Sequence, residues 1–233
     1  VRHTILHIIK YLTYISNSIS KVRKNKRGDI MDFNRRLQLR DLQVLEFINK
    51  VKVTNRNQIQ KVFFKDVHPT VCMRRLSFLT DGSYVKRARY KQNNGNNGYV
   101  YYPGGAKKPS KKLITHNLCV SEFYATMLAA GIEVLDYKPS YVIGNIISDA
   151  YIKYRGTDGL IRRIFLEVQM SGKLSDCVLK YKDIKDIIQE EKKWSSVPRL
   201  IVVSDLDDEK VHLKNIKVKY TDTQLKNIRS MLF

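Results

Sequence analysis

The sequence has 233 residues, enough for one large domain or two small ones. It holds 43 Lys and Arg residues against 22 Asp and Glu residues, a net charge of +21 that is usually matched by a polyanion such as nucleic acid. No apolar run reaches the roughly 18 residues of a membrane helix, and three widely spaced cysteines form no zinc-ligand pair. We therefore expect a cytoplasmic protein with reduced thiols and no membrane partner.

Residues 1–36 form a basic extension of uncertain status. Residue 1 is Val, which a GTG start codon gives when it is translated literally. The residues just before Met31 can be encoded by a purine-rich ribosome-binding sequence, so Met31 is the expected native start. The alternative is a genuine N-terminal helix, and an intact-mass measurement separates the two. The basic excess persists without residues 1–30.

Residues 37–102 predict three short helices followed by a β-hairpin. Periodic apolar residues over 39–48 indicate the first helix, and Thr54-Asn55 can cap the second. The third begins near Pro69, which loses no hydrogen bond in a first turn. Two β-prone runs around an Asn/Gly turn then predict a hairpin over 84–102.

This order of elements is typical of a winged helix-turn-helix, in which the third helix enters the major groove and the hairpin follows the phosphates. Outward residues of the third helix are candidates for base contacts, and cations of the hairpin are candidates for phosphate contacts. The candidate DNA-binding residues are Thr70, Arg74, Arg75, Lys86, Arg87, Arg89 and Lys91. The alternative is a three-helix protein-interaction domain with a solvated charged face.

Residues 103–112 are rich in Pro, Gly and Lys and predict a basic linker. Residues 113–233 predict an α/β domain. Its expected elements are a helix at Ile114–Ala130, strand-like runs at Ile132–Tyr137, Tyr141–Ile143 and Ile146–Tyr154, a strand at Leu160–Val168, a long helix from Ser175 to Trp194, a buried strand at Arg199–Ser204, a further helix-like stretch, a strand at Ile216–Tyr220 and a last helix.

Helix, hairpin, helix and strand follow one another as in the restriction-endonuclease-like core. The expected fold class is therefore α+β: an N-terminal winged helix-turn-helix followed by an α/β restriction-endonuclease-like domain, also written PD-(D/E)XK. Asp149 lies in the first hairpin strand. Glu167 and Gln169 lie two residues apart in the second, where side chains share one face.

These acidic residues predict metal-dependent chemistry on DNA. Two carboxylates, Asp149 and Glu167, can bind Mg²⁺ or Mn²⁺ through oxygen, and the cation then stabilises charge on a phosphate and lowers the pKa of a bound water. Gln169 stands where the pattern has Lys, and Ser148 stands where it has Pro. Gln169 can orient a water but carries no positive charge. The alternative is two carboxylates that merely face solvent at a sheet end.

Four short motifs follow one another in this part of the chain. They are His116-Asn117-Leu118, Ser148-Asp149-Ala150-Tyr151, Phe165-Leu166-Glu167-Val168-Gln169 and Lys180-Tyr181-Lys182. With the preceding winged-helix pattern, the chain over about residues 37–205 resembles the replication-relaxation family of Gram-positive mobile elements, and through it the MOBC-type plasmid relaxases.

The resemblance implies binding to double-stranded DNA at a plasmid origin, and nicking or relaxation of a strand during replication or conjugative transfer. It implies transfer or replication proteins as further partners. The catalytic positions that match its motifs are His116, Asp149, Glu167 and Gln169. Its relatives have a second acidic residue where this chain has Gln169. Glu122 is a further candidate carboxylate, and Tyr181 is a candidate nucleophile.

Three functions remain open. The chain is a metal-dependent DNA-nicking enzyme, a DNA-binding accessory protein whose nuclease-like domain is inactive, or a winged-helix transcriptional regulator. No G-x-x-x-x-G-K phosphate loop is present, which argues against ATP-driven unwinding. No two histidines stand close together after residue 30, which argues against the histidine cluster of tyrosine-dependent relaxases.

Overall fold

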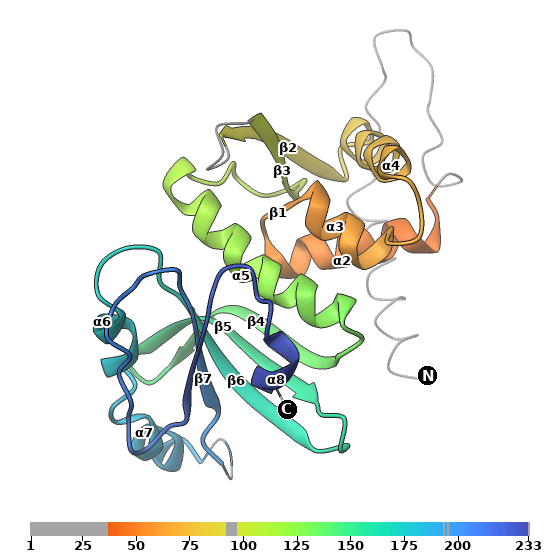
Figure 1. Cartoon of the computed structure of the whole chain (residues 1–233). Coiled ribbons are helices and arrows are strands. Elements are labelled where there is room, and N and C mark those ends of the chain that lie inside the picture. Colours follow the sequence, from red (N-terminus) through yellow and green to blue (C-terminus); the bar gives the residue numbers. More distant parts are fainter. Residues whose placement is uncertain (1–36, 92–96, 193, 195, 233) are drawn as a thin grey trace, which may run out of the picture. The chain divides into compact units, whose positions relative to one another are not determined.

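Helices and strands both contribute to the protein, and the fold class is α+β, as the sequence predicts (Figure 1). The computed structural model describes residues 37–91, 97–192, 194 and 196–232. The expected start at Met31, the basic extension 1–36 and the hairpin turn at 92–96 lie outside these residues.

Three helices open the described chain where the sequence predicts them. They are α2 (Leu39–Val51), α3 (Arg56–Phe63) and α4 (Pro69–Asp81). Asn55 begins α3 with a capping box, because its side chain and that of Gln58 each accept a hydrogen bond from the other's backbone N–H. His68 caps α4, and Pro69 takes its first position.

A small antiparallel sheet of order β1-β3-β2 accompanies these helices. Its strands are β1 (Thr54–Asn55), β2 (Val85–Lys91) and β3 (Asn97–Pro103). The hairpin of β2 and β3 is predicted by the sequence. β1 is too short to show a periodic pattern, and it pairs with β3 by setting Thr54 opposite Tyr101. We call residues 39–103 the helix-and-hairpin region.

The helix α5 (Lys111–Ala129) leads from this region into the larger sheet. It begins three residues before the expected position, so the end of the predicted linker is helical. The reason is packing, since Ile114 and Leu118 share a buried core with Val100 and Tyr102 of the hairpin.

The end of α5 is as predicted. Gly131 has a φ of +75°, the left-handed conformation that glycine adopts without strain. The N–H groups of Gly131 and Ile132 bind the carbonyls of Leu128 and Met127, which closes the last turn.

Five strands form the larger sheet, in the order β4-β5-β6-β7-β8. They are β4 (Glu133–Ile143), β5 (Ile146–Arg155), β6 (Ile161–Val168), β7 (Arg199–Val203) and β8 (Val218–Thr221). The first three are antiparallel, whereas β7 and β8 are parallel to their neighbours, so the sheet is mixed. In β7 the run from Leu200 to Val203 is at most 1% exposed, as expected for a buried strand.

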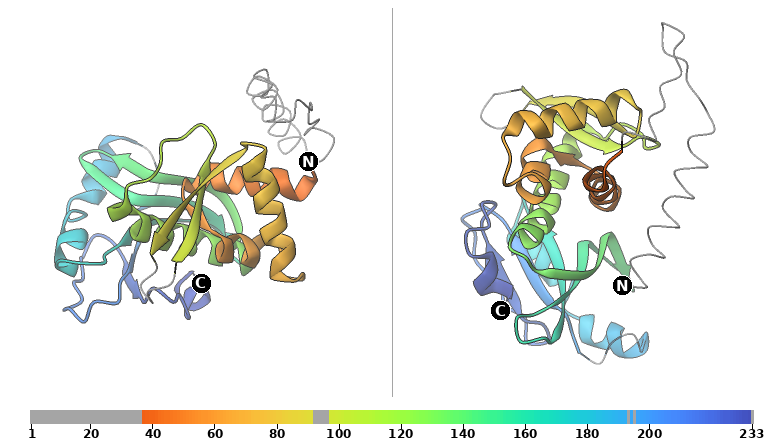
Figure 2. Two further views of the ribbon diagram at one scale, coloured as in Figure 1. Left: turned by 90° about the horizontal axis from the view of Figure 1, so that it is seen from above. Right: turned by 90° about the vertical axis from the view of Figure 1, so that its right-hand side faces the viewer.

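Helices cover both faces of this sheet (Figure 2). They are α6 (Leu174–Leu179), α7 (Ile184–Glu190), α8 (Ile228–Leu232) and α5. On one face, α6 and α7 share a core with Phe165. On the other, Tyr124 of α5 stacks on Tyr137 with ring centroids 4.3 Å apart, and the Tyr154 hydroxyl donates to the Leu232 carbonyl of α8.

The long helix predicted over 175–194 is wrong, because α6 and α7 are separated by a turn. Lys180 and Tyr181, which lie in that turn, both bind the side chain of Glu167. Neighbouring residues of an α-helix point about 100° apart, and the turn instead brings both side chains to one carboxylate.

The predicted cap of this helix is also wrong. Ser175 and Asp176 lie inside α6, and Lys173 is its first flanking residue. The N–H of Leu174 is bound by a carboxylate from far along the chain, that of Asp208, at 2.9 Å. A local sequence pattern does not contain such a distant cap.

The helix-like stretch predicted between β7 and β8 contains no helix in the structure. Side chains here bind backbone groups that a helix needs. Ser204 accepts from the Leu206 N–H, and Asp208 accepts from the Glu209 N–H. Short polar side chains of this kind compete with helical hydrogen bonds.

The structure bears on two sequence-based expectations, one about membrane helices and one about the cysteines. In the part of the chain that the structure describes, no helix is both long and apolar enough to span a bilayer. Cys72, Cys119 and Cys177 are all unpaired. Burial raises the pKa of each thiol to about 11, so these cysteines are poor nucleophiles.

Candidate functional site

The two predicted metal ligands meet where β5 and β6 end. In the register of these strands Ala150 pairs with Leu166, so Asp149 and Glu167 are the next residues on each strand. Directly opposed residues of an antiparallel pair lie about 5 Å apart at Cβ. Strand pairing alone therefore brings two carboxylates from positions 18 residues apart in the sequence into one site.

Asp149 is fixed by two donors on the same carboxylate oxygen. Its Oδ2 accepts from the backbone N–H of Val168 at 2.8 Å and from His116 Nε2 at 3.1 Å. A carboxylate only accepts, so Nε2 of His116 carries a proton in this bond. The other oxygen, Oδ1, receives no hydrogen bond from the residues that the structure describes, and it remains available to a ligand.

Glu167 is a buried carboxylate with a donor on each oxygen. It is 4% exposed, Oε1 accepts from the Tyr181 hydroxyl at 2.5 Å, and Oε2 accepts from Lys180 Nζ at 2.8 Å. Burial, and then the negative charge of Asp149, raises its pKa to about 7 in spite of both donors. Glu167 is therefore partly protonated at neutral pH, and its charged form gains from any further cation.

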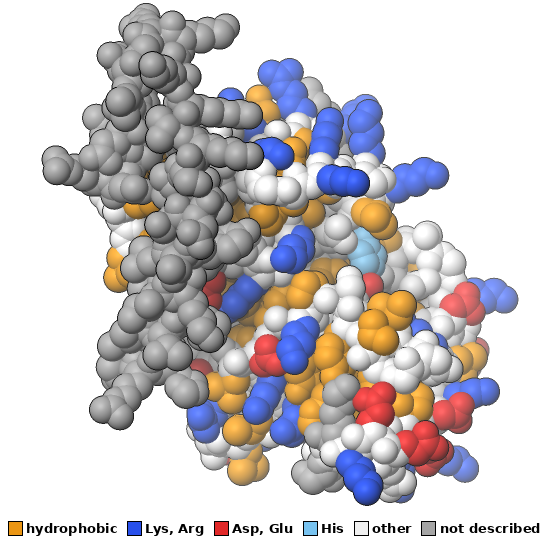
Figure 3. Space-filling view, turned by 180° about the vertical axis from the view of Figure 1, so that it is seen from behind, with side chains coloured by type: hydrophobic (Ala, Val, Ile, Leu, Met, Phe, Trp, Pro, Cys, Tyr) orange, Lys and Arg blue, Asp and Glu red, His pale blue; other side chains and the backbone are white. Residues whose placement is uncertain are grey.

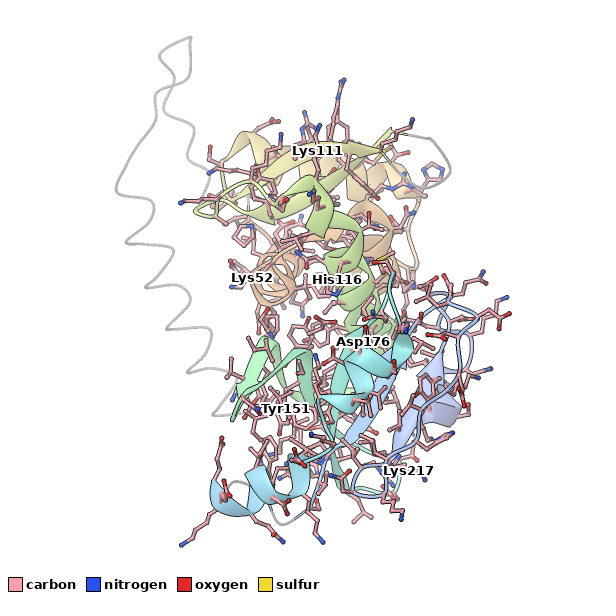
Figure 4. All side chains as sticks on the ribbon, turned by 90° about the vertical axis from the view of Figure 1, so that its left-hand side faces the viewer. Lys52, Lys111, His116, Tyr151, Asp176 and Lys217 are labelled. Atoms are coloured by element: carbon pink, nitrogen blue, oxygen red, sulfur yellow. The ribbon has the colours of Figure 1, made fainter. Side chains whose placement is uncertain are left out.

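His116 reaches the site from α5, part-way between Lys111 and the strands (Figure 4). The hydrogen bond to Asp149 raises the pKa of the imidazole, against the effect of burial. A larger share of His116 is thus protonated near neutral pH than for a solvated histidine. This side chain is 29% exposed, so it is open to a bound substrate.

Gln169 does not point its amide at the carboxylates. Its backbone N–H continues the sheet by binding the Val203 carbonyl, and its side-chain nitrogen donates to the carbonyls of Ser171 and Lys173, at 2.6 and 3.4 Å. The shared face expected from the sequence applies to the strand, but β6 ends at Val168.

Two further candidates have structural partners. Glu122 forms an ion pair with Lys61 of α3, which is not part of the carboxylate site. Tyr181 is fully buried, and burial beside Glu167 raises the pKa of its phenol, so its hydroxyl is a poor nucleophile. Among the described residues, no three His, Cys, Asp or Glu side chains cluster as a metal site.

Three of the DNA-binding candidates lie on α4, and two of them face outward. Thr70 and Arg74 are exposed. Arg75 instead turns to the body of the region, where its guanidinium forms an ion pair with Asp41, a carboxylate that is 1% exposed. Arg74 is therefore the arginine of this pair that a ligand can reach.

The hairpin candidates form a basic surface with an aromatic residue among them. Lys86, Arg87, Arg89 and Lys91 are all exposed on β2. The guanidiniums of Arg87 and Arg89 lie over the Tyr99 ring, 5.0 and 5.8 Å from its centroid. Lys and Arg side chains gather over this end of the molecule (Figure 3).

Sequence reasoning missed two cations. Arg56, the first residue of α3, lies beside α4, with its guanidinium 3.8 Å from the Met73 sulfur. Lys180 lies in the carboxylate site, whereas the sequence assigns it only to a short motif. Arg56 could have been suspected as a basic residue in a first helical turn, where the dipole disfavours it. The motif that contains Lys180 does not reveal its contact with Glu167, because strand pairing creates these surroundings.

Comparison with known proteins gives one match, and it lies in the part of the chain that carries the helices α2 to α4 and the hairpin. The family model described as replication-relaxation matches residues 45–106. The resemblance to replication-relaxation proteins is confirmed for this segment. Searches of curated proteins and of solved structures gave no match.

The replication-relaxation segment covers one of the two candidate sites. It contains all seven DNA-binding candidates, which lie between Thr70 and Lys91. His116, Asp149 and Glu167 lie beyond its end at residue 106. The family match therefore does not extend to the carboxylate site.

Proposed function

We propose that the protein binds double-stranded DNA at the origin of a plasmid or other mobile element and nicks one strand in a metal-dependent reaction, for replication or conjugative mobilisation. The observation that carries the nicking proposal is the pairing of Asp149 and Glu167 at adjacent strand ends, with His116 bound to the first. The replication-relaxation match supports the setting, a mobile element that replicates or is mobilised.

DNA binding is assigned to a winged helix-turn-helix at residues 37–102. Three helices and a basic hairpin support this assignment, as does the small sheet in which β1 joins the hairpin. In this proposal α4 enters the major groove, with Thr70 and Arg74 toward the bases. Arg75 is left out because it is paired with Asp41.

Phosphate contacts are assigned to the cations around α4 and the hairpin. They are Arg56, Lys86, Arg87, Arg89 and Lys91. Such contacts position a protein on duplex DNA without reading its sequence. The segment 103–112 is proposed as the basic link to the second domain.

The second domain, residues 113–233, is assigned to the restriction-endonuclease-like class. The order of α5, the β4–β6 strands, α6 and β7 supports it. Its site has two carboxylates, and Mg²⁺ commonly binds one or two carboxylates together with waters and substrate phosphates. The donor set thus fits Mg²⁺ or Mn²⁺, with Asp149 and Glu167 as the protein ligands.

Each residue then has a distinct task. When bound, the cation would polarise the phosphate and lower the pKa of a water ligand. The Val168 N–H and His116 hold Asp149 in one orientation, and Tyr181 holds Glu167. The hydrogen bond to Asp149 raises the pKa of His116 and so favours its protonated form, which can give a proton to a leaving sugar oxygen.

A second candidate is an inactive DNA-binding accessory protein or regulator. Gln169 favours it, since its amide binds loop carbonyls and it offers neither a positive charge nor a third carboxylate. In this case Asp149 and Glu167 are remnants of a site, and the second domain is a scaffold. Both candidates act in the cytoplasm, with transfer or replication proteins as expected partners.

Nicking of a supercoiled plasmid that carries the element's own origin region separates the two candidates. The assay compares wild type with Glu167→Gln and Asp149→Asn, with Mg²⁺ or Mn²⁺, and a band-shift experiment measures duplex binding in parallel. Nicking by wild type alone, with binding kept in both variants, supports the enzyme. Binding without nicking by any of the three contradicts it and supports the accessory protein.

A further inference from the structure

Lys180 returns from the turn between α6 and α7 to the ends of the two strands that carry the carboxylates. Its Nζ donates to Glu167 Oε2 and to the Ile147 carbonyl, each at 2.8 Å. Ile147 lies two residues before Asp149 on β5, and Glu167 lies on β6. The ammonium group therefore contacts both strands at the position where Asp149 and Glu167 meet.

The ammonium group lies at the solvent side of a buried carboxylate. The side chain of Lys180 is 34% exposed, whereas that of Glu167 is 5% exposed. An ammonium has three N–H donors. Two are bound to Glu167 and Ile147, and within the described part of the chain no further acceptor takes the third. That donor is available to an oxygen of a bound phosphate.

The residue at position 169 does not supply a positive charge to this site. In the PD-(D/E)XK pattern a lysine two residues after the second carboxylate brings a positive charge to the site, and this chain has Gln169 there. The amide of Gln169 is engaged by the carbonyls of Ser171 and Lys173. Lys180 reaches the second carboxylate, Glu167, from the turn that follows α6.

We propose that Lys180 is a catalytic residue whose ammonium group contacts the phosphate under attack and supplies the positive charge that position 169 lacks. The inference rests on the nicking function proposed above. In that reaction a water oxygen bonds to phosphorus as the P–O bond to one sugar breaks. The water gives up a proton, and the leaving sugar oxygen takes one up. Lys180 keeps its own proton and stabilises charge on the non-bridging oxygens.

The rival role is structural, in which Lys180 only neutralises buried Glu167. The two roles differ in what its removal does to cation binding. If Lys180 is catalytic, the carboxylates still bind a divalent cation when Lys180 is replaced, because the ammonium group competes with that cation for Glu167. A lysine that only positions Glu167 would, when removed, weaken cation binding and nicking together.

The experiment uses the full chain and compares Lys180→Met, Lys180→Arg and the relocated lysine, Gln169→Lys with Lys180→Met. The matched control is Lys182→Met, because the side chain of this neighbour is 70% exposed and its Nζ lies 4.0 Å from Asp183. Nicking of the origin plasmid is measured beside Mn²⁺ binding to the DNA-free protein by calorimetry. Fluorescence of Trp194, the single tryptophan, checks folding.

We expect Lys180→Met to lower the nicking rate about 100-fold without weakening Mn²⁺ binding, and Lys182→Met to stay within about twofold. Lys180→Arg and the relocated lysine should recover part of the loss, and Lys180→Arg, which keeps a cation on Glu167, keeps the test valid if Lys180→Met fails to fold. Wild-type nicking by Lys180→Met, or parallel losses of nicking and Mn²⁺ binding, would overturn the role of Lys180 alone. An inactive wild type that still binds DNA would overturn the nicking function and this role with it.

Discussion

Glu167 is the residue at which burial, charge and the proposed chemistry meet. Its carboxyl is almost completely buried and lies near a second carboxylate, and these two effects raise its pKa to about 7. Lys180 and Tyr181 offset only part of that cost. A group kept in this state reduces the stability of the free protein, as is common where a site is built to receive a ligand.

The raised pKa of Glu167 predicts how stability changes with pH. The unfolded state releases this proton near pH 4.5 and the folded state only near pH 7, so the free energy of unfolding falls as pH rises through this window. The loss from this group is on the order of 3 kcal/mol. His116, whose pKa is also raised, acts in the same direction, so wild type must be compared with Glu167→Gln.

Urea unfolding of both proteins at pH 5 and pH 8, followed by Trp194 fluorescence, measures this difference. We expect a smaller decrease in Glu167→Gln than in wild type between the two pH values. Glu209→Gln, at an exposed position, is the control and should behave as wild type. Equal decreases in all three proteins would show that Glu167 titrates normally.

At the scale of elements, α4 shows how neighbouring arginines acquire different tasks. Arg74 is exposed, and Arg75 neutralises the buried carboxylate of Asp41 on α2. The helical pattern of the sequence places both arginines on the outer face of α4. The distinction appears only when α2 packs nearby and supplies a partner.

Alanine substitutions at these two positions should therefore affect different properties of the protein. Arg74→Ala is expected to weaken DNA binding about tenfold or more, as for loss of one groove contact, and to leave the melting temperature unchanged. Arg75→Ala leaves Asp41 buried without its ion pair, which costs about 3 kcal/mol of stability. Thermal melts and duplex-binding titrations on both variants test this, and equal melting temperatures would refute the assignment of Arg75.

Elements set by local contacts were predictable from the sequence, and those set by distant partners were not. Capping signals and apolar periodicity located α3, α4, the hairpin and β7, because these features are local. The interruption after α6 escaped prediction since it depends on Glu167, which lies 13 residues before Lys180. Motif order named His116, Asp149, Glu167 and Lys180 alike, but only the strand register shows that Lys180 contacts Glu167.

The sequence predicts the helix α5 but does not reveal that this helix contacts two parts of the protein. α5 carries His116 to Asp149, and it is also bound to α3 through Gln58, a 1% exposed side chain. Gln58 donates to the Leu118 carbonyl and accepts from the Ser121 hydroxyl, at 2.8 and 3.0 Å. A buried polar network of this kind fixes the position of α5 against α3, and so the place from which His116 reaches the site.

At the scale of the whole molecule, the positions of the basic residues matter more for DNA binding than the size of the net charge, +21. Charge of one sign spread evenly would bind any polyanion, anionic membranes included. The cations proposed for DNA are instead concentrated on the hairpin and beside α4, and they surround an aromatic ring at Tyr99. Phosphate contacts made there should be separable from the general basic character of the chain.

Salt dependence of duplex binding provides that separation. If Lys86, Arg87, Arg89 and Lys91 each neutralise a phosphate, replacing all four by Met should make the slope of log K against log salt shallower by about 3 to 4. The control replaces four exposed lysines near the larger sheet, which are Lys182, Lys185, Lys214 and Lys217, and changes the net charge equally. Affinity titrations at several salt concentrations should give the control a slope close to that of wild type. Equal changes in both variants would mean that overall charge, and not the hairpin surface, holds the DNA.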